Sequence, residues 1–267
     1  MLNLPAHRPY LIGVVHLLPL PGAPRYGGRF APVVEAAVTD AAALAEGGAD
    51  AIIVENFGDA PFHASDVPAE TVAGITLAAR EVVSAAGERP VGINVLRNDV
   101  RSALGICAVT GATFVRVNVH TGAAVTDQGL IEGRAAETLR ERARICPEVA
   151  LLADVHVKHA TPLGDETAAE SAADLVGRGL ADAVIVSGTG TGRAPEADAV
   201  NGLREHVSGA DLLLGSGVTE DNAAALCASA DGAIVGTWLK RDGRVDAPVD
   251  VARVRRMIAA FEAVRAR

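Results

Sequence analysis

The chain has 267 residues, 49% of them hydrophobic, so it can bury one large core or at most two small ones and is not expected to be disordered. Its 33 acidic and 24 basic side chains give a formal net charge of −9, which repels polyanions, so no nucleic acid is expected as a partner. Three widely spaced cysteines fit neither a disulfide framework nor a metal-ligand pattern. No apolar run approaches the roughly 20 residues of a membrane-spanning helix, and the first residues lack a signal-peptide pattern. We therefore expect a cytoplasmic protein with no membrane partner.

Eight short apolar runs alternate with longer Ala-rich segments along the chain. The runs are too short for buried helices, and their nearly continuous apolar character is typical of parallel strands covered on both faces. The predicted strands are Tyr10–Leu17, Ala51–Glu55, Val91–Leu96, Phe114–Val119, Ala150–Val155, Ala183–Ser187, Asp211–Gly215 and Gly232–Gly236. The Ala-rich segments have the apolar spacing of helices. The predicted helices are Val33–Glu46, Pro68–Ala85, Asn98–Val109, Gly133–Ile145, Glu166–Arg178, Ala197–Val207, Asp221–Ala228 and Val249–Ala266.

The regular spacing of these elements predicts one closed barrel. The strand midpoints recur about every 31 residues, which is the length of one strand–helix unit in a (β/α)8 TIM barrel. Several predicted helices are followed by glycine, as at Gly48 and Gly111, where a left-handed residue turns the chain toward the next strand. No linker composition divides the chain, so we expect residues 1–267 to form a single α/β domain. An open doubly wound sheet, which would use fewer strands, is the alternative.

Polar side chains end the first five predicted strands, at the edge where a TIM barrel builds its ligand site. They are His16, Glu55, Asn94, Arg116, Asn118, Asp154, His156 and Lys158. Because side chains alternate along a strand, Asp154, His156 and Lys158 are expected on one face, and Arg116 and Asn118 on another. If these faces point inward, ionisable groups converge at the mouth of the barrel.

We interpret these side chains as catalytic residues. Glu55 and the Asp154/His156 pair would transfer protons, while Lys158, Arg116 and Asn94 would hold and polarise an anionic substrate. The alternative is a layer of structural salt bridges, but burying several charges for stability alone costs about as much as it returns.

Three further side chains have competing interpretations. His16 and Asn94 are candidates that could instead satisfy backbone groups. Asp59 has the sequence position of either a catalytic group or a turn residue.

A divalent-metal site at the same edge is an alternative interpretation of some of these residues. Glu55, Asp154 and His156 are of the types that bind divalent metals, but their spacing is not diagnostic, and Lys158 would compete as a positive charge. We therefore expect no metal and no cofactor.

The last three predicted strands run into loops rich in small residues. Backbone N–H groups in such loops can approach an anion closely, and the loops after strands seven and eight are the usual phosphate site of this barrel. The predicted substrate- or phosphate-binding residues are Asn118, Ser187, Gly188, Thr189, Gly215, Ser216, Gly217, Gly236 and Thr237. The alternative is that the glycines only form tight turns. The Gly- and Pro-rich segment Pro19–Phe30 is a candidate lid, from which Arg25 would reach the substrate.

Seven segments distributed along the chain resemble those of the BtpA family. They are His16–Pro24, Val54–Phe62, Gly92–Asn98, Arg116–Asn118, Ala153–His159, Val186–Gly192 and Gly215–Thr219. The resemblance covers nearly the whole barrel and implies a TIM barrel of the ribulose-phosphate-binding type. The family's name comes from a proposed role in photosystem I biogenesis, whereas its SgcQ-like members accompany genes of sugar metabolism, so the resemblance implies no single reaction.

The segment Val54–Phe62 is also similar to the catalytic-loop region of the tryptophan synthase alpha chain. There a glutamate at the end of strand two and a following aspartate act as acid and base. The similarity implies these roles for Glu55 and Asp59, although the stretch between the two is shorter in this chain.

Together these features favour an enzyme that acts on a phosphorylated sugar or nucleoside-like metabolite by acid/base chemistry, as a lyase or isomerase. A Schiff base at Lys158, testable by borohydride trapping, is a variant of this mechanism. A metal-dependent hydrolase of a phosphate or glycosidic bond is one alternative, and a non-catalytic assembly or regulatory factor of the BtpA type is another. Barrels of this size often pair through their helices, so a homo-oligomer is expected.

Overall fold

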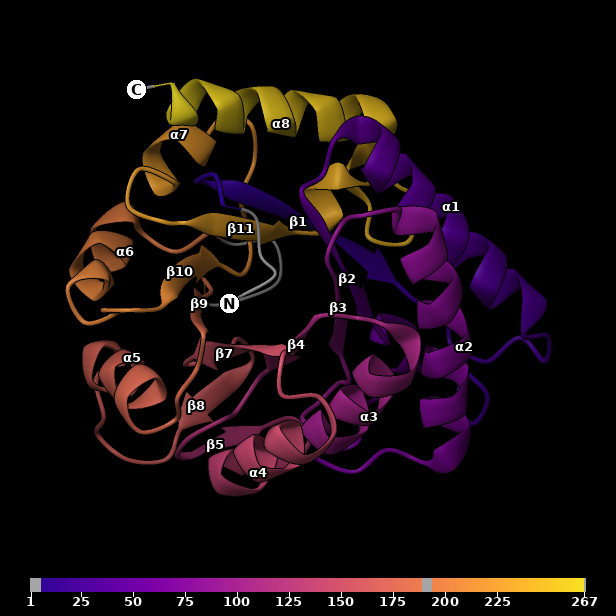
Figure 1. Ribbon diagram of the computed structural model, residues 1–267, viewed down its shortest axis with the longest axis horizontal. Helices are drawn as coiled ribbons and strands as arrows, with labels where there is room; N and C mark the ends of the chain where they lie inside the picture. Colours follow the sequence, from indigo (N-terminus) through magenta and orange to yellow (C-terminus); the bar gives the residue numbers. More distant parts are fainter. Residues whose placement is uncertain (1–5, 189–193, 267) are drawn as a thin grey trace.

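Eight parallel strands form a closed barrel in the computed structural model, which describes residues 6–188 and 194–266 (Figure 1). Their order around the barrel is β1, β11, β10, β9, β7, β4, β3, β2, and β1 closes it by pairing with both β2 and β11. The barrel strands are β1 (Tyr10–His16), β2 (Ala51–Glu55), β3 (Val91–Asn94), β4 (Phe114–Val117), β7 (Ala150–Val155), β9 (Ala183–Val186), β10 (Asp211–Leu214) and β11 (Gly232–Val235). The predicted TIM barrel is confirmed.

Helices surround the barrel, and α8 lies between α1 and α7 where the ring closes (Figure 1). The α-helices of the described residues are α1 (Ala31–Gly47), α2 (Ala69–Ala86), α3 (Val100–Thr110), α4 (Ala135–Ile145), α5 (Ala168–Gly177), α6 (Ala197–Arg204), α7 (Ala223–Leu226) and α8 (Val251–Arg265). Gly48 and Gly111 are left-handed C-caps with φ of 93° and 86°, as their positions predict. The predicted and observed helices differ most at α7. It is short because the residues before it form hydrogen-bonded turns around Asn222.

A three-stranded antiparallel sheet was missed by the sequence analysis. It consists of β5 (Ala123–Thr126), β6 (Gly129–Glu132) and β8 (Ala160–Pro162), with β5 in the centre. These strands are three or four residues long, too short for a clear alternating pattern. Ala124 and Ile131 pack with Val119 and Val157 in a small separate core. The sheet therefore anchors the segment between β7 and β8 at the mouth of the barrel.

The barrel interior is apolar along most of the strands and polar at the carboxyl ends of the strands. Val14 of β1 and Ile53 of β2 belong to the interior cluster, and alternation carries the same inward faces on to His16 and Glu55. The strand register pairs His16 with Glu55, and Glu55 with Asn94. Three polar side chains from neighbouring strands are thereby placed at one level above the apolar interior.

The close packing inside the barrel gives a first prediction. We expect Gly92→Ala to lower the free energy of unfolding by about 1–3 kcal/mol, because a Cβ at Gly92 would overlap the ring of Phe114. Gly105→Ala in α3 is the control, since a Cβ at Gly105 meets no atom within 4 Å and alanine is the better helix former by about 0.5–1 kcal/mol. Urea unfolding of both variants measures the difference. Equal stability of the two variants would show that the Phe114 ring moves aside without cost.

Two further features concern the protein as a whole. Among the described residues, no helix combines the length and the apolar character needed to cross a membrane. Cys107, Cys146 and Cys227 are free and buried, where they pack as small residues of the main core.

Candidate active site

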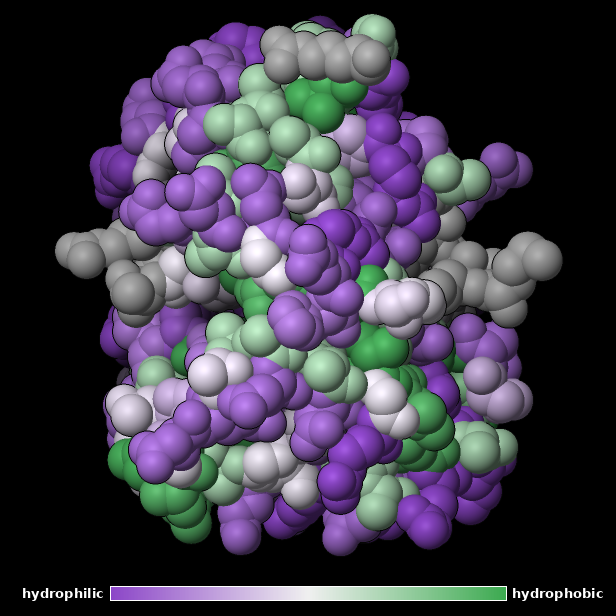
Figure 2. Space-filling view, turned by 90° about the vertical axis from the view of Figure 1, so that its left-hand side faces the viewer, coloured by the Kyte–Doolittle hydropathy of each residue, from purple (hydrophilic) through white to green (hydrophobic). Residues whose placement is uncertain are grey.

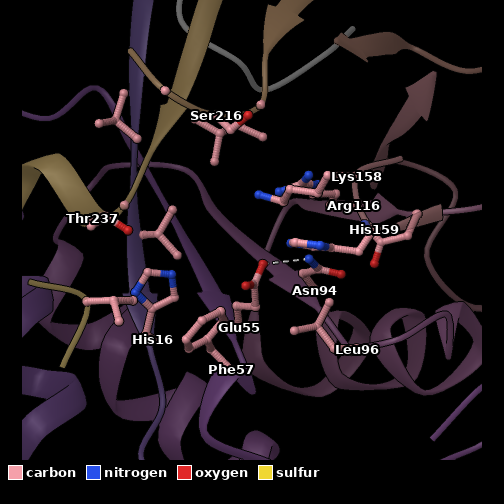
Figure 3. A pocket seen from close by; sticks show the side chains of 18 of the residues that line it. His16, Glu55, Phe57, Asn94, Leu96, Arg116, Lys158, His159, Ser216 and Thr237 are labelled. Atoms are coloured by element: carbon pink, nitrogen blue, oxygen red, sulfur yellow. Dashed lines mark hydrogen bonds between the residues drawn. The ribbon is translucent and has the colours of Figure 1, made fainter. Parts of the chain in front are cut away.

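A cavity of about 500 Å³ opens at the carboxyl ends of the barrel strands (Figure 3). Its wall includes side chains from β1 to β4, from the loops after β1, β2 and β3 and from the segment after β7, together with β11 and the loops after β10 and β11. The predicted site residues that line it are His16, Glu55, Asn94, Arg116, Asn118, Lys158, Gly215, Ser216, Gly217, Gly236 and Thr237. The polar strand ends and the last two glycine-bearing loops therefore share one cavity.

Glu55 is buried in this cavity, with 9% of its surface exposed. Its Oε2 accepts a hydrogen bond of 2.7 Å from Nδ2 of Asn94 (Figure 3). Burial would raise the pKa of the Glu55 carboxyl, but the His16 ring in its protonated form, the cations Arg116 and Lys158, and the hydrogen bond from Asn94 together lower it. Glu55 is therefore a carboxylate at neutral pH and can accept a proton.

His16 faces Glu55 from the neighbouring strand (Figure 3). Its ring packs against Phe57 with 4.8 Å between centroids, and among the described residues its Nδ1 has no hydrogen-bond partner. Burial lowers the pKa of His16 to about 4, although the charge of Glu55 opposes this. The imidazole is therefore neutral at neutral pH, so one ring nitrogen can donate a hydrogen bond and the other can accept one.

The burial of His16 predicts a loss of stability in mild acid. Between the ordinary pKa of 6.5 and the folded-state pKa of about 4, the unfolded chain binds a proton that the folded chain excludes, so stability falls as the pH is lowered. We expect His16→Gln to remove about 1–2 kcal/mol of the loss between pH 7 and pH 5. Urea unfolding at both pH values checks this. His206→Gln, at an exposed position outside the cavity, should retain the wild-type dependence, and an unchanged slope in His16→Gln would contradict the prediction.

Arg116 forms a buried, two-pronged ion pair with Asp154. Its Nε and Nη2 donate to the carboxylate oxygens at 2.9 and 2.8 Å, and Nδ2 of Asn118 donates to the same carboxylate at 2.8 Å. The Asp154 side chain is 0% exposed and does not line the cavity. Its place in the structure corrects the expectation that it transfers protons to a substrate. Asp154 instead positions Arg116 and Asn118, which both line the cavity.

Lys158 enters the cavity from the segment that joins β7 to β8 (Figure 3). Val157 anchors this segment in the small core under the three-stranded sheet, and the Lys158 carbonyl accepts a hydrogen bond of 2.6 Å from Nη2 of Arg97. Burial and the charge of Arg116 lower the pKa of the Lys158 amine, while Glu55 opposes the shift. The backbone of Lys158 is thus held in place, and its amine loses a proton more readily than that of an exposed lysine.

The loop after β10 has a shape fixed by Asn222. Its Nδ2 donates to the carbonyl of Gly217 at 2.9 Å, and its Oδ1 accepts from the N–H of Thr219 at 2.8 Å. Gly217 has a φ of 72°, a conformation in which a side chain would be strained. These hydrogen bonds therefore fix the conformation of the loop backbone at the cavity wall.

Glycines also bring the last two loops close to the side chains of the cavity. A Cβ at Gly215 would lie 3.5 Å from Nη2 of Arg116 and would collide with the hydroxyl of Ser187, and one at Gly236 would lie 2.8 Å from Cε1 of His16. A side chain at either position would overlap atoms that are already there. The two glycines therefore let the loop backbone approach Arg116 and His16 closely.

Several predicted site residues lie elsewhere. His156 does not line the cavity, because β7 ends at Val155 and the chain turns through a positive φ of 45° at His156, which ends the alternation. Its Nε2 is buried without a partner among the described residues. The expectation that Asp154, His156 and Lys158 share one cavity face is therefore wrong for the first two.

The described residues of the loop after β9 do not line the cavity. Ser187 and Gly188 are absent from its described lining, and Thr189 lies outside the described residues. The N–H of Gly188 donates to Oγ of Ser216 at 3.2 Å. Gly188 therefore contacts the side chain of Ser216, which does line the cavity.

Asp59 and Arg25, the candidates from the loops after β2 and β1, differ in whether they line the cavity. Asp59 accepts hydrogen bonds from the N–H of Leu20 at 2.8 Å and from Nδ2 of Asn56 at 3.0 Å and does not line the cavity, which favours its interpretation as a turn residue. Arg25, from the predicted lid segment, does line it.

The suggested metal ligands are not brought together. Among the described residues, no group of three or more His, Cys, Asp or Glu side chains is arranged to hold a metal ion. Asp154 is bound to Arg116, and His156 lies outside the cavity, so Glu55 is the one member of the suggested set that lines it.

Phe57 and Arg97 are among the lining residues that the sequence analysis missed. Both lie beyond the last residue of a strand, Phe57 two residues after Glu55 and Arg97 three residues after Asn94. The candidates were mostly strand-terminal residues, and in the loop after β2 only Asp59 was named. An arginine directly after the predicted strand Val91–Leu96 was the available signal for Arg97.

The sequence profile of the BtpA family matches residues 7–263. The chain belongs to the BtpA family. Among its relatives in that family, the "Photosystem I biogenesis protein BtpA" of Synechocystis sp. is 48% identical over 96% of this chain and 88% of its own length. An uncharacterized protein of Thermococcus kodakarensis is 47% identical over 96% of both chains. An uncharacterized mitochondrial protein of Caenorhabditis elegans is 30% identical over 94% of this chain and 92% of its own.

Solved structures with the same fold include enzymes of low sequence identity to this BtpA-family chain. Phosphoribosyl anthranilate isomerase from Thermus thermophilus matches with a TM-score of 0.56 and 15% identity, over 96% of this chain and 99% of that one. KGPDC from Streptococcus mutans matches with a TM-score of 0.61 and 11% identity over the same shares. At these identities the likeness shows the TIM-barrel fold alone.

Proposed function

We propose that this BtpA-family chain is an enzyme that acts on a phosphorylated sugar or nucleoside-like metabolite by proton transfer, as a lyase or isomerase. One observation carries the proposal. The ionised Glu55 shares a single cavity with the cations Arg116 and Lys158 and with the glycine loops after β10 and β11. A carboxylate base, groups that stabilise negative charge and an anion cradle are the parts that such a reaction needs.

Each part has a role that follows from its chemistry. The backbone at Gly215–Gly217 and Gly236–Thr237 holds the phosphoryl group. Glu55, oriented by Asn94, removes a proton from the carbon next to a carbonyl. Arg116 stabilises the negative charge that develops on the carbonyl oxygen, and Lys158 helps to hold the anionic substrate. The protonated Glu55 can return its proton to a carbon or oxygen of the substrate, and the neutral His16 ring on the neighbouring strand can donate a hydrogen bond there. The alternative in which Lys158 forms a Schiff base stays a prediction.

Proton transfer can be tested before the natural substrate is known. The protein is incubated in D2O with a panel of phosphorylated sugars and nucleotides, and NMR follows deuterium entering carbon positions as well as product formation. We expect exchange or conversion for at least one compound that binds. Absence of both for every compound that binds would contradict the proposal.

A second function is favoured by the Synechocystis relative, whose name assigns it to photosystem I biogenesis. A non-catalytic assembly factor would bind its partners through its surface, and large exposed apolar patches mark such surfaces. The face in Figure 2 is mostly hydrophilic, with its apolar residues in small separate groups.

Complementation separates the two functions. Wild-type chain and Glu55→Gln are expressed in a Synechocystis strain that lacks its own relative, and photosystem I is quantified. An enzyme requires Glu55, so we expect only the wild type to restore photosystem I. Equal restoration by a Glu55→Gln variant of equal abundance would favour the assembly role.

A further inference from the structure

The cavity wall carries more positive than negative charge, although the whole chain has a net charge of −9. Among the described lining residues, four carry a cation and one carries a carboxylate, Glu55. The cations are Arg25, Arg97, Arg116 and Lys158. Asp154 balances Arg116 through the buried ion pair, and Glu55 can balance one more. Positive charge therefore remains in the wall without a counter-ion from the described chain.

Arg97 is the least expected of these cations, because it is 6% exposed and has no ion pair within the described residues. Its Nη2 donates to the Lys158 carbonyl, whereas its Nε is buried without a partner. Burial lowers the pKa of Arg97, and the more distant Asp127 and Asp154 offset this only in part. A buried guanidinium stays charged, and leaving such a charge unpaired is costly. An anion from outside the chain would remove that cost.

The surplus charge lies away from the predicted phosphate cradle. Lys158 and His159 lie across the cavity from Thr237 (Figure 3), and Arg97 is hydrogen-bonded to the backbone of Lys158. Arg116 lies beside Lys158 in Figure 3 and also approaches Gly215 in the loop after β10, whereas Thr237 in the loop after β11 lies across the cavity from both. A phosphoryl group in the glycine loops would therefore leave Arg97 and Lys158 free to bind a different part of the same molecule.

We propose that the substrate carries a second anionic group, a carboxylate or a further phosphoryl group, which binds to Arg97 and Lys158 at the end of the cavity opposite the glycine loops. This inference rests on the proposed function, because it assumes that a first phosphoryl group occupies those loops. The Arg97 guanidinium lines the cavity and supplies one positive charge for the second group, and Lys158 supplies another. The substrate is thus a phosphorylated compound with anionic groups at both ends.

Three six-carbon probes that differ at one end test the proposal. Glucitol 6-phosphate has one anionic group, 6-phosphogluconate adds a carboxylate at the other end, and glucitol 1,6-bisphosphate adds a phosphoryl group there. Isothermal titration calorimetry at low salt measures the dissociation constant of each. We expect at least one of the doubly anionic probes to bind about tenfold tighter than glucitol 6-phosphate. Which of the two does so identifies the second group.

Variants locate the effect. In Arg97→Gln the tenfold preference should fall to about twofold or less, because the charge that selects the second anion is removed. Arg97→Lys keeps the charge but loses the planar fork, so an intermediate preference is expected. Arg80→Gln is the matched control. It also removes one guanidinium that donates to a backbone carbonyl, that of Thr110, but Arg80 does not line the cavity, so the preference should stay at about tenfold.

The outcomes distinguish this inference from the proposed function. If none of the three probes binds to the wild type, the phosphate cradle itself is wrong, and the proposed function and this inference fail together. If all three bind with equal affinity, the cradle stands and the second subsite is refuted. If the preference exists but persists unchanged in both Arg97 variants, the second anion binds elsewhere.

Discussion

We expect Glu55→Gln to lose about 10²- to 10⁴-fold in kcat on whichever phosphorylated substrate the D2O experiment identifies, which is the range that one general base contributes. Glutamine has the shape of glutamate and can still accept the hydrogen bond from Asn94, but it cannot take up a proton at neutral pH. Because the substitution removes a buried charge and no volume, the fold should persist. Steady-state kinetics measures the loss, and the affinity for the singly phosphorylated probe shows whether the binding site is intact.

The matched control for Glu55→Gln is Asp59→Asn, four residues further along the chain. Asp59 carries the same functional group, but its carboxylate is bound to Leu20 and Asn56 and does not line the cavity. Asp59→Asn should therefore keep most of its turnover. A kcat of Glu55→Gln equal to that of the wild type would exclude Glu55 as the base, and a large loss in Asp59→Asn would return that residue to the list of candidates.

The second large effect concerns stability. We expect Asp154→Ala to lower the free energy of unfolding by about 3–5 kcal/mol, because it leaves the Arg116 guanidinium buried without its counter-ion. It also removes the acceptor of the Asn118 side chain. Urea unfolding measures the change. The double variant Arg116→Met/Asp154→Leu should recover part of the loss, because it removes the charge of Arg116 together with its counter-ion.

An exposed pair in the same chain provides the comparison for Asp154→Ala. Arg244 and Asp246 also form an ion pair at 2.8 Å, but their side chains are 68% and 66% exposed. Asp246→Ala should therefore leave the free energy of unfolding nearly unchanged. Similar losses in Asp154→Ala and Asp246→Ala would mean that Arg116 finds another partner or reaches solvent.

Local sequence patterns were sufficient to predict the barrel. Short apolar runs separated by amphipathic Ala-rich segments leave few ways to bury both faces of every strand, and glycines such as Gly48 and Gly111 mark where helices end. Short elements were not predictable in this way. The strands β5, β6 and β8 have three or four residues each and are stabilised by pairing with one another, which a pattern along the chain does not reveal.

The sequence by itself determined that this protein is a TIM barrel and that polar side chains such as His16, Glu55 and Asn94 end its strands, because both properties follow from periodicity along single segments. Tertiary structure alone decided which of those polar groups can meet a ligand. Asp154 continues the inward face of β7 but is bound by Arg116 from the neighbouring strand, and the alternation that should have carried His156 inward stops where β7 stops. Arg97 lines the cavity through a loop that carries no periodic pattern. Alternation fixes the direction of a side chain only while the strand lasts, whereas its partners depend on strand register and on the loops that close the barrel mouth.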